Sequence, residues 1–158
     1  MKNLIISAII FLTIYLAINC MNKIKLHNKA LNESVLMLEQ IEILLSYNNL
    51  NTEELFYELS LNNNYNFLTF INDGFKASAI EQSINKIKEL NKNDKEILIN
   101  YFSLLGKSDL NGQLRNCKIF KERLKDNLKK SMNNEVRECK STGIIILGIG
   151  FLLVIYLI

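Results

Sequence analysis

Residues 93–117, NDKEILINYFSLLGKSDLNGQLRNC, contain the sequence pattern of two helices joined by a tight turn. The first half carries apolar residues at helical spacing, namely Ile97, Leu98, Tyr101, Phe102 and Leu105. Asn93 and Glu96 form a capping pair for this helix, because a side chain at each position can satisfy a backbone N–H of the first turn. Gly106 ends the helix, since glycine tolerates the positive φ of a helix terminus.

The second helix of the pair is the longest that the middle of the chain predicts. Ser108 or Asp109 caps it, and Ser108 is the proposed N-cap. Its apolar stripe consists of Leu110, Leu114, Cys117, Leu124, Leu128, Met132 and Val136. Because the stripe continues so far, we expect this helix to run into the apolar segment that follows it.

Upstream of this pair, the same apolar spacing predicts further helices. A long first helix carries Ile24, Leu31, Val35, Leu38, Ile41 and Leu45 and ends near Tyr47. Asn51 and Glu54 form the capping pair of the next helix. A short helix is expected over residues 65–72 and another over residues 80–90. No stretch alternates convincingly over strand length, so the predicted fold is all-α, an antiparallel bundle of about six helices.

Both ends of the chain are strongly apolar. Residues 4–21 contain no charged side chain, and neither do residues 143–158. A membrane-spanning helix needs about 20 mostly apolar residues, with a lower limit near 17. We therefore predict an N-terminal transmembrane helix at 1–21, a helical bundle domain at 22–142 and a C-terminal transmembrane helix at 143–158.

Basic residues indicate the orientation of these segments. The first segment is followed by Lys23, Lys25 and Lys29, and the second is preceded by Arg137 and Lys140. The positive-inside rule then predicts a two-pass membrane protein whose middle domain faces the cytoplasm. The N-terminal segment could instead be a cleaved signal, but asparagine before Cys20 fits a lipoprotein site poorly, so an uncleaved anchor is preferred.

Charge is distributed unevenly along the middle domain. Residues 30–75 contain seven acids and no base. Residues 115–130 contain seven bases against Glu122 and Asp126, and the bases are Arg115, Lys118, Lys121, Arg123, Lys125, Lys129 and Lys130. This basic stretch could face anionic lipid headgroups, an acidic partner or another copy of the chain. Alternatively, the charges could simply lie on solvated helix faces and pair within the fold. Nucleic acid is not an expected partner, because no aromatic residues interleave with the bases in the required way.

Catalytic and cofactor motifs are missing from the sequence. It contains no phosphate-binding glycine loop, zinc-binding HExxH or GxSxG nucleophile motif. The only histidine, His27, is expected to be a solvated residue close to the membrane. Glu33, Glu39 and Glu42 are expected to coat a solvated helix rather than bind a metal. We therefore predict a protein that is not an enzyme and that needs no cofactor or metal.

The segment 104–113, LLGKSDLNGQ, resembles a signature of the stage III sporulation protein AB family. In that family a helix ends at Leu-Gly, a Ser or Thr followed by Asp restarts the chain, and Gln follows four residues later. Gly106, Ser108, Asp109 and Gln113 occupy those places. The chain departs from the family pattern in having no tryptophan, and in replacing a usual proline around Asn51 and Thr52.

The resemblance implies an assembly role in endospore formation. The family belongs to the channel between mother cell and forespore, and it is similar to the inner-membrane platform protein of type II secretion and type IV pilus machines. The resemblance therefore implies a platform subunit that docks a cytoplasmic ATPase to the membrane subunits of the channel. It places this subunit in the mother-cell membrane around the forespore, where the chain could also form a homo-oligomer. The four signature residues would then form either a partner-binding surface or a structural turn. The alternative is a general membrane-anchored helical adaptor or sensor with no secretion role.

Overall fold

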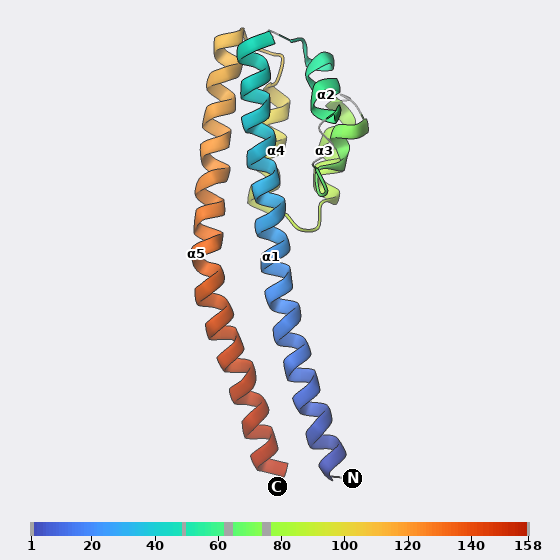
Figure 1. Ribbon diagram of the computed structural model, residues 1–158, viewed down its shortest axis with the longest axis vertical. Coiled ribbons are helices and arrows are strands. Elements are labelled where there is room, and N and C mark those ends of the chain that lie inside the picture. The colour runs from blue at the N-terminus through green and yellow to red at the C-terminus, as the bar shows by residue number, and fades with distance from the viewer. Residues whose placement is uncertain (1, 49, 62–64, 74–76, 158) are drawn as a thin grey trace. The chain divides into compact units, whose positions relative to one another are not determined.

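The computed structural model describes residues 2–48, 50–61, 65–73 and 77–157, and every regular element in these ranges is a helix (Figure 1). In chain order the elements are α1 (Lys2–Asn48), α2 (Thr52–Leu61), the 3₁₀ helix η1 (Thr69–Asp73), α3 (Ala77–Lys86), α4 (Lys92–Leu104) and α5 (Leu110–Leu157). The predicted all-α class is confirmed. The number of helices differs slightly from the prediction, because the element expected at 65–72 is a short 3₁₀ helix.

The chain forms two compact units, which are described separately. One unit is His27–Lys129, and the other consists of Met1–Leu26 together with Lys130–Ile158. Within the described ranges, no helix combines the length and the apolarity needed to cross a membrane, so the transmembrane helices predicted at 1–21 and 143–158 are not found there. The buried core and the signature turn both belong to the unit His27–Lys129.

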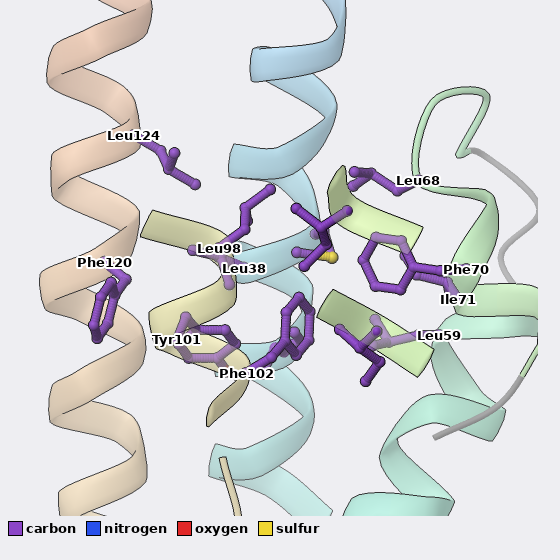
Figure 2. Close-up of a cluster of buried hydrophobic side chains, with 14 of the residues drawn as sticks. Leu38, Leu59, Leu68, Phe70, Ile71, Leu98, Tyr101, Phe102, Phe120 and Leu124 are labelled. Carbon is purple, nitrogen blue, oxygen red and sulfur yellow. The ribbon is translucent and has the colours of Figure 1, made fainter. Parts of the chain in front are cut away.

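Apolar side chains from every helix of the unit His27–Lys129 form its core (Figure 2). Figure 2 shows Leu38 of α1, Leu98 of α4 and Leu124 of α5, and all three are fully buried. Burying a leucine side chain stabilises a fold by about 1.5–3 kcal/mol. The stripes found in the sequence therefore correspond to core faces in this unit. The prediction was wrong for Met132 of α5, which is 55% exposed, and Val136 lies outside the residues whose side chains are described.

Aromatic rings of α4 connect the two sides of this core. The ring of Tyr101 lies 5.8 Å from that of Phe120 on α5. The neighbouring Phe102 turns toward the other side, where its ring lies 5.5 Å from Phe70 of η1 at 89° and 5.8 Å from Phe56 of α2. Edge-to-face pairs of this kind add about 0.5–1.5 kcal/mol beyond the area that they bury. Helix α4 is therefore the central packing element.

The capping pair predicted for α2 is confirmed. The backbone N–H of Glu54 donates to Asn51 Oδ1 at 2.9 Å, and the N–H of Asn51 donates to Glu54 Oε2 at 3.1 Å. This reciprocal arrangement satisfies two N–H groups that the first turn of a helix leaves without partners. The helix ends at Leu61, as expected.

The segment after α2 differs from the prediction because Glu33 holds its backbone. The carboxylate of Glu33 accepts hydrogen bonds from the N–H groups of Asn66, at 2.5 Å, and Phe67, at 2.7 Å. These N–H groups are oriented toward α1, so regular helical structure begins only at Thr69. Gly74, the expected end of this helix, lies outside the described residues.

The connection between α3 and α4 also corrects the sequence prediction. Helix α3 ends at Lys86, so Ile87 and Leu90 are buried in the connection rather than on the helix. Asn91, not Asn93, is the N-cap of α4, since its side chain accepts the N–H of Asp94 at 2.9 Å. The helix therefore starts two residues earlier than expected, and the third helical position is occupied by Asp94 instead of Glu96.

Candidate functional site

The signature residues lie in the turn that connects α4 to α5. Helix α4 ends at Leu104, and the N–H of its C-cap, Leu105, donates to the carbonyl oxygen of Tyr101 at 3.1 Å. Gly106 follows with φ +77°, in the left-handed region that glycine enters without a steric penalty. A Cβ at this position would also lie only 2.8 Å from Thr52 Oγ1 at the start of α2. Gly106 therefore both reverses the chain and allows the turn to approach α2.

Asp109 caps α5, which corrects the proposal that Ser108 is the N-cap. Asp109 Oδ1 accepts the N–H of Gly112 at 3.1 Å, and its carbonyl oxygen accepts the N–H of Gln113 at 2.9 Å. A Cβ at Gly112 would lie 2.8 Å from that same carboxylate oxygen and 2.9 Å from Ser108 Oγ. Glycine at this position thus makes room for the cap, a role that the sequence analysis did not assign.

The side chain of Gln113 makes hydrogen bonds to the backbone of two other residues of the turn. Its Nε2 donates to the carbonyl oxygen of Ser108 at 3.1 Å, and its Oε1 accepts the N–H of Gly106 at 3.3 Å. The structure thus brings all four signature residues together in one hydrogen-bonded turn. Asp109 and Gln113 have a structural role there, while the side chains of Ser108 and Asp109 remain exposed to solvent.

Two of the seven bases expected to form one basic surface instead bind α5 to α1. Lys121 forms an ion pair with Glu42, and Lys125 forms one with Glu39 at 2.7 Å. The hydrogen bond to Glu39 raises the pKa of Lys125. These pairs also correct the view that Glu39 and Glu42 only coat a solvated helix.

The other five bases are exposed along α5. They are Arg115, Lys118, Arg123, Lys129 and Lys130, and we call them the outward bases. The guanidinium of Arg123 lies 5.6 Å from the ring centre of Phe120, which restrains its position by a cation–π contact. Glu122 and Asp126 are exposed on the same helix, so the face carries both signs with an excess of positive charge.

His27 was expected to be solvated, but its side chain is only 20% exposed and contacts other parts of the fold. Its Nδ1 lies 2.8 Å from the carbonyl oxygen of Glu89, and its Nε2 lies 3.6 Å from Oδ2 of Asp94. Asp94 is fully buried, and its Oδ1 accepts a hydrogen bond from Asn127 Nδ2 at 2.7 Å. This cluster joins α1, α4 and α5. The sequence analysis missed it, because nothing in the sequence places residue 27 beside residues 94 and 127.

The glutamates considered as metal ligands are all engaged within the fold. Glu33 binds two backbone N–H groups and Glu39 and Glu42 bind lysines, as described above. In the part of the chain that the structure describes, no three His, Cys, Asp or Glu side chains gather as a metal site would require. Cys117 is buried, donates from Sγ to the carbonyl oxygen of Leu38 at 3.1 Å, and has its pKa raised to about 11 by burial.

Comparison with known proteins identifies a family over almost the whole chain. Neither a search of curated proteins nor a search of solved structures returned a match. A family model described as stage III sporulation protein AB matches residues 2–158. The match includes the turn formed by Gly106, Ser108, Asp109 and Gln113. The chain belongs to the stage III sporulation protein AB family.

Proposed function

We propose that this protein is a non-enzymatic, membrane-tethered platform subunit of the channel between mother cell and forespore. In this role it would dock a cytoplasmic ATPase to the membrane subunits of the apparatus. The observation that carries the proposal is the family match over residues 2–158, which supports a role in stage III sporulation. The platform role is what the family resemblance implies, and a compact helical unit with apolar ends is physically suited to it.

Membrane attachment is supported by the apolar side chains near both ends of the chain. Phe11 is 75% exposed and Phe151 is 68% exposed, and neighbouring leucines and isoleucines are exposed as well. Exposed apolar side chains in such density are unfavourable in water and favourable in a lipid environment. We propose that residues 1–21 and 143–158 enter the bilayer and that the unit His27–Lys129 faces the cytoplasm.

The outward bases of α5 are the proposed contact surface for an anionic partner. Five positive side chains point away from the core, whereas Lys121 and Lys125 are neutralised by α1. Each base near an anionic membrane surface contributes about 1 kcal/mol of attraction, and an acidic protein face would attract the same residues. Lipid headgroups and the ATPase are therefore two possible sources of the negative charge.

One set of variants separates these sources. Lys118→Glu, Arg123→Glu and Lys129→Glu are combined in the full chain, which leaves the ion pairs of Lys121 and Lys125 intact. The matched control reverses Glu122 and Asp126 to Lys on the same helix. If the ATPase binds this face, the triple variant will fail to recover the ATPase from sporulating cells, while the control will recover it.

If lipid binds the face, the triple variant will still recover the ATPase, but the protein in neutral-lipid nanodiscs will no longer associate with acidic vesicles. Unchanged behaviour in both assays would reject a binding role for the outward bases. The general adaptor alternative is tested by deleting the gene. Normal numbers of heat-resistant spores would reject the sporulation channel and favour that alternative.

A further inference from the structure

Asp94 is a buried carboxylate that lacks one hydrogen bond. Its side chain is fully buried in the first turn of α4. Oδ1 accepts from Asn127 Nδ2 at 2.7 Å, whereas Oδ2 makes no hydrogen bond within the described residues. Nε2 of His27 lies 3.6 Å from Oδ2. A buried polar atom without a partner is costly, by about 1–3 kcal/mol, and more when it is charged.

The second contact of His27 determines which ring nitrogen carries hydrogen. Nδ1 lies 2.8 Å from the carbonyl oxygen of Glu89. A carbonyl oxygen can only accept, so the ring must donate from Nδ1. In the neutral imidazole, Nε2 then carries a lone pair rather than a hydrogen. That lone pair faces Asp94 Oδ2, which is also an acceptor when the carboxyl group is ionised.

Two acceptors that face each other across 3.6 Å are satisfied when a single proton lies between them. We propose that His27 and Asp94 together bind one proton, and that this shared proton ties α1 to α4 in the folded protein. The proton can reside on Nε2, giving an imidazolium beside a carboxylate, or on Oδ2, giving a neutral acid that donates to the ring. In both forms the proton offsets the repulsion between two acceptors, although their separation of 3.6 Å is longer than a hydrogen bond.

The surroundings of Asp94 favour retention of this proton. His27 of α1 and Asn127 of α5 are the side chains that approach the carboxyl group, and His27 is the ionisable group that acts on it. Burial raises the pKa of Asp94, and the hydrogen bond from Asn127 and the charge of His27 act in the opposite direction. The net effect is a raised pKa, because removing a carboxylate from water disfavours its charged form.

The sign of the pH dependence follows from linkage. A carboxyl group with a raised pKa holds its proton more tightly in the folded state than in the unfolded state. Its stabilising contribution is present below the ordinary aspartate pKa of about 3.9 and is lost as the pH rises through the raised value. The fold should therefore lose stability with rising pH relative to a variant in which residue 94 cannot ionise.

Asp94→Asn is that variant. The asparagine oxygen can still accept from Asn127, and its amide group can donate permanently to His27 Nε2. The full chain is studied in detergent micelles, and the equilibrium constant of unfolding is measured from about pH 4 to about pH 8. We expect the ratio of the wild-type constant to that of Asp94→Asn to increase by up to about tenfold per pH unit within the titration window. The matched control, Asp126→Asn, removes an exposed carboxylate from α5 and should follow the wild type.

NMR of the wild type gives a test that does not depend on any variant folding. His27 is the only histidine, so labelling histidine with ¹⁵N yields signals from one imidazole. We expect the ring to carry a hydrogen on Nδ1, which donates to the carbonyl oxygen of Glu89. A ring that carries its hydrogen on Nε2 alone would overturn the proposal. So would unfolding constants of wild type and Asp94→Asn that change in parallel with pH.

Discussion

Ser108 and Asp109 are neighbours at the start of α5, but their side chains have different roles. Asp109 Oδ1 accepts the N–H of Gly112, whereas Ser108 contributes its carbonyl oxygen, which accepts from Gln113. The Asp109 carboxylate also lies at the positive end of the helix dipole, which adds about 0.3–1 kcal/mol. The cap therefore depends on the second of the two residues.

Replacement of each residue by alanine should separate these roles. Asp109→Ala is expected to lower the free energy of unfolding by ~1 kcal/mol, because the capping oxygen is lost. Ser108→Ala should change it by no more than about 0.5 kcal/mol, as is usual for an exposed position. Urea denaturation of both variants measures the difference. A larger loss for Ser108→Ala than for Asp109→Ala would contradict the assignment of the cap.

Among the elements, the segment that leads into η1 depends on one carboxylate of α1. Glu33 is 8% exposed and accepts two backbone N–H groups, those of Asn66 and Phe67. Hydrogen bonds to charged groups contribute about 1.5–3 kcal/mol each, so this contact is strong. Beside it, Tyr65 donates from its hydroxyl group to Gln40 Oε1 at 2.7 Å, and burial together with Glu33 raises the pKa of Tyr65 to about 12.

Glu33→Gln should weaken this connection without unfolding the core. The amide can accept only through its oxygen, and its NH₂ group would face the second backbone N–H. We expect a loss of about 1–3 kcal/mol in stability and faster amide exchange at Asn66 and Phe67. Glu39→Gln is the control, because its surface ion pair with Lys125 contributes only about 0–1 kcal/mol. Equal exchange rates in wild type and Glu33→Gln would show that the carboxylate does not hold the segment.

The elements also show how far local sequence patterns determine this fold. Capping of α2 by Asn51 and Glu54, and the end of α4 at Gly106, depend on residues within one helical turn, and both were predicted correctly. The start of α4 was misplaced by two residues although its cap, Asn91 accepting the N–H of Asp94, is equally local. The contacts of the Asp94 carboxyl group with Asn127 and His27 are of another kind. Such contacts join residues 33 and 67 positions apart, so no local pattern contains them. For the same reason, the sequence did not distinguish Lys121 and Lys125, which form ion pairs with α1, from the outward bases, which are exposed.

At the scale of the whole molecule, the proposed role depends on the proposed insertion of the apolar ends into a bilayer and on its orientation. The basic residues Lys23, Lys25 and Lys29 follow the first apolar segment, and Arg137 and Lys140 precede the second. Only Lys2 lies on the outer side of these segments. Because basic residues flanking a span are retained in the cytoplasm, this bias predicts a cytoplasmic unit His27–Lys129 with both termini on the opposite side.

Fluorescent fusions test this topology directly. A reporter that fluoresces only in the cytoplasm is joined after Lys130 in one fusion and after Ile158 in the other. The first fusion should fluoresce, because its reporter follows the cytoplasmic unit, and the second should be dark, because the second apolar segment carries the reporter across the bilayer. Both fusions should remain in the membrane fraction after alkaline carbonate extraction, a treatment that removes peripheral proteins. Fluorescence after Ile158 would mean that the second segment does not cross. A dark fusion after Lys130 that is present at full length would place the helical unit outside the cytoplasm, where no cytoplasmic ATPase could bind it.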